Sequence, residues 1–207
     1  MQMINWDDLP DFKLKNGKKT ALTIGVFDGL HRGHQALITK IIQKAPELLP
    51  AVVTFRENPK KYAFINKKTA EFDKAAAGSF KDIIHFEEKI KLLDKFGITL
   101  CVIIDFSEYF SKISGRAFLE TLNRHLCPAY IGLGENFHCG YRRDTDAKAF
   151  KALALSMGIE AEIVPPVLEG GRAVSSSRIR KALEAQNYEE ASLLLGRPYK
   201  DRAFPKF

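Results

Sequence analysis

Two histidines, His31 and His34, stand three residues apart in a glycine-rich turn, and their spacing suits the binding of phosphate. The turn reads Gly25-Val26-Phe27-Asp28-Gly29-Leu30-His31-Arg32-Gly33-His34. An apolar run at 21–24 precedes it and apolar residues at helical spacing follow it, which predicts a strand, a turn and a helix N-terminus. The first N–H groups of a helix have no partner within the helix and carry partial positive charge. A nucleotide phosphate is therefore the natural occupant of this turn.

The two imidazoles would lie on one side of the first helical turn and add hydrogen-bond donors for the same anion. The chain has no Gly-x-x-x-x-Gly-Lys-Ser/Thr loop, and histidines in place of the lysine favour nucleotidyl transfer over γ-phosphoryl transfer. Two other interpretations of the pair are satisfied surface histidines and half of a zinc site. The strand, glycines and helix around the pair favour the phosphate site. Asp28 is expected to be a structural turn residue or a weak metal contact.

A second polar cluster lies late in the chain, where Ser175, Ser176 and Ser177 precede a helical pattern that contains Arg180. Serine is a common helix N-cap, but capping alone explains only one of the three hydroxyls. The arrangement predicts a second helix N-terminus that offers N–H, O–H and guanidinium groups to phosphate oxygens. We expect both helix N-termini to converge on one triphosphate.

These segments resemble a known family. The turn at 25–34 resembles the signature of the bacterial FAD synthetases, in their N-terminal FMN adenylyltransferase module, within the His-x-Gly-His nucleotidyltransferase superfamily. Residues 174–180, Val-Ser-Ser-Ser-Arg-Ile-Arg, resemble the superfamily's Ile-Ser-Ser-Thr-x-x-Arg motif, and residues 191–199 resemble the segment that closes the module. The resemblance covers about residues 20–199, so we expect 1–207 to form one adenylyltransferase domain without a riboflavin kinase module.

Two more segments carry the resemblance with departures from the family pattern. Residues 54–59 are similar to Thr-Phe-x-Pro-His-Pro, which lies beside the flavin, although Glu57 and Asn58 replace proline and histidine. Residues 134–140 are similar to Gly-x-(Asp/Asn)-Phe-x-Phe-Gly, which shapes the flavin and adenosine pocket, although Cys139 replaces an aromatic residue. The pocket residues implied by the resemblance are Phe55, Asn58, Asn136 and Phe137.

The residues of these two segments also have simpler interpretations. Phe55 could equally be a core residue. The adjacent His138 and Cys139 could suggest a metal site, but no second pair of ligands stands at the spacing that a zinc site needs.

The resemblance implies that the chain transfers AMP from ATP to FMN, giving FAD and diphosphate, with Mg²⁺ held mostly by ATP and water. The triphosphate would contact His31 and His34, with His34 nearest the α-phosphate. Its β,γ end would contact Arg180 and the three serines. Backbone near Gly25, Phe27 and Gly33 would lie against the nucleotide. His31, His34 and Arg180 are the expected catalytic residues, and FMN would come from a separate source.

Two alternatives stay open. Another nucleotidyltransferase of the superfamily, acting on a different phosphate-bearing acceptor, would share both phosphate motifs. A non-catalytic flavin- or nucleotide-binding regulator would not need the donors that stabilise a transition state.

The alternation of expected elements predicts an α/β fold, a doubly wound, mostly parallel Rossmann-like sheet with helices on both faces. After a lead-in at 1–19, we expect strands at 21–24, 51–55, 100–104 (central), 129–133 and 161–164, the last strand of the chain. Helices are expected after the turn as far as Pro46, at 80–96, after a Ser114 cap, at 145–157, at 176–185 and at 188–195, with an irregular excursion at 56–79.

Length, composition and charge limit the class of protein further. The chain has 207 residues, 45% hydrophobic and 28% charged, as in an ordinary globular domain. Its net charge of +7 comes from scattered lysines and arginines without a nucleic-acid reader motif, so a polyanionic small substrate is a sufficient reason for it. No transmembrane run or signal peptide is visible, and three widely spaced cysteines favour reduced thiols in a cytoplasm.

Overall fold

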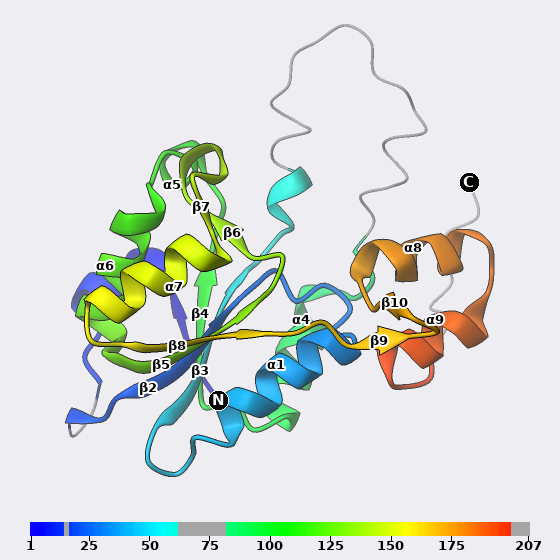
Figure 1. Ribbon diagram of the computed structural model, residues 1–207, viewed down its shortest axis with the longest axis horizontal. Coiled ribbons are helices and arrows are strands. Elements are labelled where there is room, and N and C mark those ends of the chain that lie inside the picture. Colours follow the sequence, from blue (N-terminus) through cyan, green and yellow to red (C-terminus); the bar gives the residue numbers. More distant parts are fainter. Residues whose placement is uncertain (15–16, 62–81, 200–207) are drawn as a thin grey trace, which may run out of the picture.

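A six-stranded, all-parallel sheet forms the centre of the protein, in a computed structural model that describes residues 1–14, 17–61 and 82–199 (Figure 1). The strand order is β1-β4-β3-β2-β5-β8. In that order the strands span Gln2–Asn5, Leu100–Ile104, Leu49–Phe55, Thr20–Ile24, Pro128–Gly134 and Glu160–Val164. The five residues of β2 and of β4 are all buried, as expected for strands covered on both faces.

Helices cover both faces of the sheet. One face carries α6 (Gly115–Leu126) and α7 (Ala147–Ser156), whose buried residues share a core with Leu22, Val53 and Val102. The other face carries α1 (Arg32–Ile42) and α4 (Phe86–Lys95), which pack against Val52 and Cys101. The expected doubly wound α/β fold is therefore confirmed.

The order of the strands reverses beside β2. From β2 the chain moves outward through β3 and β4 on one side, and then returns to place β5 and β8 on the other side. In open α/β sheets, ligands bind at the carboxyl ends of the strands where such a reversal occurs. The turn that contains the two histidines follows β2 at this point.

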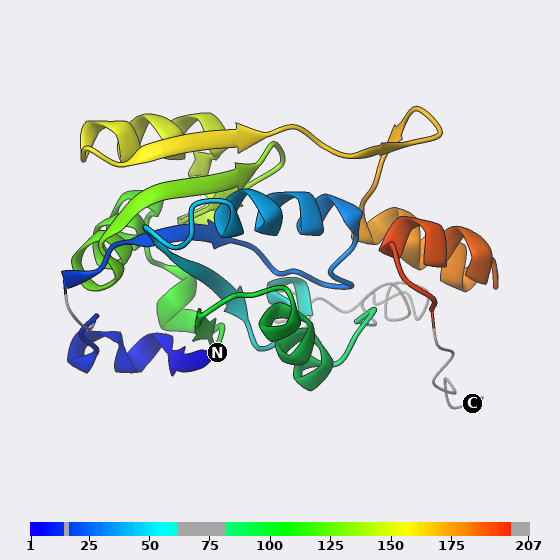
Figure 2. The ribbon, with the colours of Figure 1, turned by 90° about the horizontal axis from the view of Figure 1, so that it is seen from below.

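A small C-terminal unit extends beyond the sheet. It contains the hairpin of β9 (Leu168–Glu169) and β10 (Arg172–Ala173), followed by α8 (Ser176–Glu184) and α9 (Tyr188–Leu195). Figures 1 and 2 both show these two helices at one end of the molecule, on the side where the N-terminus of α1 lies. Their apolar residues form a separate cluster that includes Ile83 from the segment before α4.

Several expectations of local structure were wrong. Residues 1–19 are not only a lead-in: β1 pairs in parallel with β4, and a 3-10 helix at Trp6–Asp11 buries Leu9 in the core. Since β1 buries only Ile4, it shows no alternating pattern from which a strand could be predicted. The strand β4 is second from the edge because β1 extends the sheet beyond it.

The boundaries of other helices and strands also differ from those predicted. The helix expected at 80–96 begins at Phe86, because Ile83 packs against the C-terminal cluster instead. Thr145 pairs in the two-residue strand β7 (Thr145–Asp146) with β6 (His138–Cys139), and Asp146 caps α7. The sequence analysis also missed β9, β10 and the short helix α5 (Glu108–Ser111). Most of the excursion at 56–79 lies outside the described residues.

Candidate active site

The turn after β2 is built around the buried side chain of Phe27. Gly25 continues the strand ladder through its N–H to the Val53 carbonyl, at 3.0 Å. The chain then adopts positive φ at Phe27, Gly29 and Leu30, of 52°, 82° and 40°. A Cβ on Gly25 would lie 3.1 Å from the Phe27 ring, so this position favours glycine.

The two histidines stack on each other at the start of α1. Their ring centroids are 3.6 Å apart, with 16° between the planes. His31 is the N-cap, and its Nδ1 accepts the N–H of His34 at 3.3 Å, which assigns the proton of a neutral His31 to Nε2. Burial lowers the pKa of His31 to about 4 and the pKa of His34 well below its usual value. Both imidazoles are therefore neutral near pH 7 in the unliganded protein.

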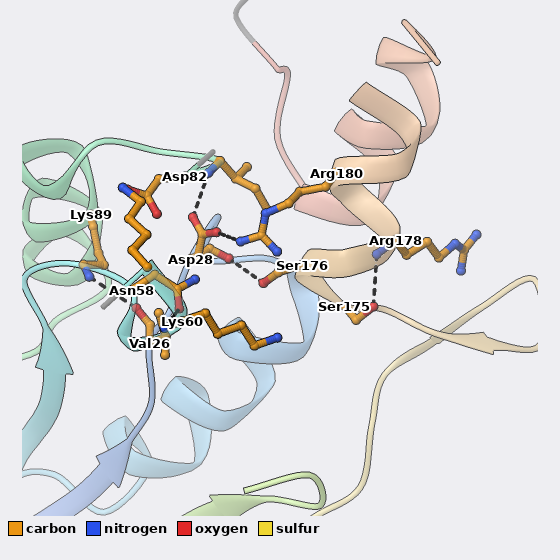
Figure 3. A network of polar contacts seen from close by, with 12 residues as sticks. Val26, Asp28, Asn58, Lys60, Asp82, Lys89, Ser175, Ser176, Arg178 and Arg180 are labelled. Atoms are coloured by element: carbon orange, nitrogen blue, oxygen red, sulfur yellow. Dashed lines mark hydrogen bonds and ion pairs between the residues drawn. The ribbon is translucent and has the colours of Figure 1, made fainter. Parts of the chain in front are cut away.

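Asp28 joins the early turn to the late helix. Its buried carboxylate accepts the N–H of Ile83 at 2.8 Å and forms an ion pair with Arg180 (Figure 3). Its backbone carbonyl accepts the Ser176 hydroxyl at 2.9 Å. Burial raises the pKa of the Asp28 carboxyl, and the Arg180 guanidinium opposes that shift. The interpretation of Asp28 as a structural turn residue fits these contacts.

The N-terminus of α8 lies against the N-terminus of α1. Ser175 caps α8 and accepts the N–H of Arg178 at 3.2 Å, while Ser177 is exposed. A Cβ on Gly33 would lie 3.2 Å from the His31 ring and 3.5 Å from the Val174 carbonyl oxygen. The two expected phosphate-binding helix ends therefore converge, although two of the three serines already have structural hydrogen bonds.

Arg197, which the sequence analysis did not single out, also holds the histidine turn. Its guanidinium donates to the carbonyls of Gly29 and Leu30, at 2.8 and 3.2 Å. The side-chain amide of Gln35 joins the Leu30 carbonyl to that of Leu195, at 2.8 Å each. The sequence signal that could have identified Arg197 was its position within residues 191–199, which resemble the closing segment of the family's adenylyltransferase module.

Lys89 is a second residue that sequence reasoning missed. Its side chain is 6% exposed, and its Nζ donates to the carbonyls of Phe55 and Val26, at 2.6 and 3.2 Å (Figure 3). Burial lowers the pKa of Lys89 to about 8. Nothing in the sequence marks this lysine, because α4 also carries lysines that face solvent.

The expected acceptor residues lie at the carboxyl ends of β3 and β5, the neighbours of β2. Phe55 packs against the rings of Phe106 and Phe110, each at 6.1 Å between centroids, which fits its interpretation as a packing residue. Asn58 accepts the backbone N–H of Lys60 at 3.1 Å and lines a cavity of about 20 Å³. In the turn after β5, Asn136 is exposed and Phe137 packs edge-on against Phe150.

The described residues contain no group of three or more His, Cys, Asp or Glu side chains able to hold a metal ion. Asp28 is already paired with Arg180, and the neighbouring Asp82 is paired with Lys61. These carboxylates therefore do not form a ready site for Mg²⁺. His138 Nδ1 lies 3.1 Å from the Asn136 carbonyl, and Cys139 forms no disulfide.

A doubly wound parallel sheet with two helix N-termini meeting beside its point of strand reversal has the architecture of a Rossmann-like nucleotidyltransferase domain. The chain belongs to the FAD synthetase family, whose sequence model matches residues 13–178. This membership confirms the resemblance to that family.

The curated relatives are longer than this chain. A bifunctional riboflavin kinase/FMN adenylyltransferase from Haemophilus influenzae is 31% identical over 183 residues, which are 87% of this chain and 56% of that protein. The protein of the same name from Escherichia coli strain K12 is 29% identical over 180 residues, 86% of this chain and 54% of that protein. The chain thus spans about half the length of the curated relatives it matches.

A solved structure shares the fold. A crystal structure titled macrolide-efflux protein, from Streptococcus pneumoniae, matches with a TM-score of 0.79 and 27% identity, over 96% of this chain and 61% of that one. In the described part of this chain, no helix is both long enough and apolar enough to span a bilayer.

Proposed function

We propose that this chain is an FMN adenylyltransferase, which transfers AMP from ATP to FMN and releases diphosphate. The observation that carries the proposal is the direct connection of the histidine turn to α8 through Asp28, Ser176 and Arg180. It brings two helix N-termini and a guanidinium to one place, as a triphosphate requires. Family membership supports the same reaction.

In the proposed reaction, a phosphate oxygen of FMN attacks the α-phosphorus of ATP, and diphosphate leaves on the opposite side. No covalent enzyme intermediate is needed, so catalysis consists of positioning the reactants and stabilising the charge that develops on phosphate oxygens. We assign His31 and His34 to the triphosphate, with His34 nearest the α-phosphate. A bound triphosphate places negative charge beside both imidazoles and so raises their pKa values, which strengthens them as donors.

The start of α8 would hold the other end of the triphosphate. We assign Arg180 and residues Ser175–Ser177 to the β- and γ-phosphates. The ion pair with Asp28 fixes the orientation of the Arg180 guanidinium before ATP arrives, which reduces the entropy lost on binding. Mg²⁺ would come with ATP and be held by phosphates and water, in keeping with the paired state of Asp28.

The remaining assignments concern the parts of the site that would hold the adenosine of ATP and the acceptor. Backbone around Gly25, Phe27 and Gly33 would face the adenosine. The acceptor would lie across the ends of β3 and β5, near Phe55, Asn58, Asn136 and Phe137. We further propose that residues 1–207 act as one domain.

Incubation of the chain with Mg-ATP and FMN tests the proposal. We expect FAD and diphosphate in equal amounts, detected by chromatography and a diphosphate-coupled assay. Release of diphosphate only with another phosphate-bearing acceptor would identify a different nucleotidyltransferase. Saturable binding of FMN and ATP with no product would identify a regulator and overturn the proposal.

A further inference from the structure

The buried ammonium of Lys89 connects two segments of the site. One of its carbonyl partners belongs to Val26, in the turn between β2 and the histidines, and the other belongs to Phe55, the last residue of β3. The Val26 carbonyl also accepts the Thr54 hydroxyl at 3.2 Å. The side chain of Lys89 thus spans from the nucleotide turn to the segment that follows β3.

Packing alone does not explain a lysine at this position. Burying an ammonium costs free energy, and a methionine of similar length would fill the same space without a charge. The charged and titratable groups around it are the carboxyls of Asp28 and Asp82, the neutral Cys101 thiol on β4, the neutral His34 imidazole on α1 and the Arg56 guanidinium after β3. Its two hydrogen-bond partners are nevertheless both backbone carbonyls.

We propose that Lys89 is a positioning residue for nucleotidyl transfer: its ammonium ties the carboxyl end of β2 to that of β3 and sets the separation between the bound nucleotide and the acceptor. The inference rests on the proposed function. In-line attack requires the reacting atoms to lie about 3–3.5 Å apart, and a misplacement of about 1 Å can cost about 10²-fold in rate. A bond between the two segments therefore acts on the rate of transfer more than on the binding of either substrate.

A lysine fits this role because its ammonium has three donors. Two reach the carbonyls, and Lys89 also lines the cavity of about 20 Å³ that it shares with Asn58, Asp82 and Arg56. A cavity of this size and polarity is large enough for one water molecule. The ammonium can therefore link both strand ends to a polar cavity on the acceptor side.

Substitution of Lys89 tests the inference, with Lys91→Met, at an exposed position of the same helix, as the matched control. For Lys89→Met we expect kcat for FAD formation to fall 10- to 100-fold. The dissociation constants of ATP and FMN, each measured alone, should change less than about 3-fold. Amide hydrogen exchange should become faster at residues 26–29 and 55–58 in Lys89→Met and stay unchanged in Lys91→Met. Lys89→Gln, which keeps donors but not the charge, should retain more activity than Lys89→Met.

A merely structural role predicts different results. Lys89→Met would then lose activity only in proportion to its unfolded fraction, which urea unfolding measures. With the proposed role, Lys89→Met stays folded near pH 7, and the wild type gains stability relative to it as pH rises above about 8, where the folded chain sheds a proton that the unfolded chain keeps. A folded Lys89→Met with kcat and exchange rates like those of the wild type overturns the inference. Absence of FAD from the wild type itself would instead overturn the proposed function, whatever the exchange data show.

Discussion

At the scale of single residues, the site is a set of groups whose charges are adjusted by burial. The stacked imidazoles of His31 and His34 are neutral, the carboxyl of Asp28 has a raised pKa, and the ammonium of Lys89 has a lowered one. Such shifts cluster at functional sites because catalytic groups need them. Here desolvation by burial is the largest cause of all four shifts.

The donors assigned to the phosphates should each support turnover. We expect His34→Ala and Arg180→Ala to lower kcat by about 10²–10³-fold with modest change in FMN affinity, because each removes a donor that stabilises developing charge. Diphosphate release under saturating substrates measures the effect. His125→Ala and Arg124→Ala, in the last turn of α6 on the opposite face of the sheet from α1, serve as controls. Near-normal turnover in both site variants would show that the assignment is wrong.

The buried state of His31 should make the protein less stable in mild acid. Its folded pKa of about 4 lies below the unfolded value of 6.5, so between these values the unfolded chain binds more protons. From this residue alone, the free energy of unfolding should fall by about 2 kcal/mol between pH 7 and pH 5. His31→Asn keeps a side chain able to cap α1 but cannot titrate, so its urea unfolding should depend less on pH. A pH slope equal to that of the wild type would contradict the prediction, and His125→Asn is the control.

The sequence identified which polar residues belong to the candidate site, but not which of them form ion pairs and hydrogen bonds with one another. The histidines and Arg180 stand out by type and spacing, and the structure brings them to one place. The ion pair of Asp28 with Arg180 joins residues 152 positions apart, so no local pattern could reveal it. Lys89 was missed for a similar reason, since a lysine in a helix gives no sign of being buried.

At the scale of elements, the site depends on how closely α8 approaches α1. The contact is at Gly33, where the His31 ring and the Val174 carbonyl both lie near the missing Cβ. The apolar run of β2 and the helical spacing of α6 predicted those elements well, whereas α1 ends at Ile42 and not near Pro46 as expected. The beginning of α4 was not, because Ile83 continues the helical spacing but packs against α8 and α9.

Gly33→Ala separates the stability of α1 from its function. Alanine is the better helix former by about 1 kcal/mol, which offsets the cost of its close contact with the His31 ring, so the free energy of unfolding should change little. The added methyl group would press on the His31 ring, 3.2 Å away, and would be in ordinary contact with the Val174 carbonyl oxygen, at 3.5 Å, so we expect displacement of the imidazole to weaken ATP binding at least 10-fold. Calorimetry or fluorescence titration with ATP measures this effect. Thr39→Ala, at an exposed position of the same helix, should leave ATP affinity intact, and unchanged affinity in Gly33→Ala would refute the role given to this contact.

At the scale of the whole molecule, the sequence predicted the central sheet and its helices better than the edge strand and the peripheral hairpin. Buried parallel strands read as continuous apolar runs, and their alternation with helices left few possible topologies. The edge strand β1 and the hairpin of β9 and β10 are short and largely exposed, so their patterns are too weak to predict.

The 207-residue chain should act on FMN but not on riboflavin. Its described residues fold into one sheet domain with a C-terminal helical unit, and it matches only about half of each bifunctional relative. Incubation with Mg-ATP and riboflavin should yield neither FMN nor FAD, whereas FMN supplied to the same sample should be converted. Chromatographic detection of FMN formed from riboflavin would contradict this prediction.

The ion pair between Asp28 and Arg180 has a consequence for synthesis on the ribosome. All six strands of the sheet are translated before α8, so a nascent chain can complete its sheet while the Asp28 carboxylate still lacks its guanidinium. The proposed triphosphate site is therefore completed only after α8 has been translated, so its assembly follows that of the sheet.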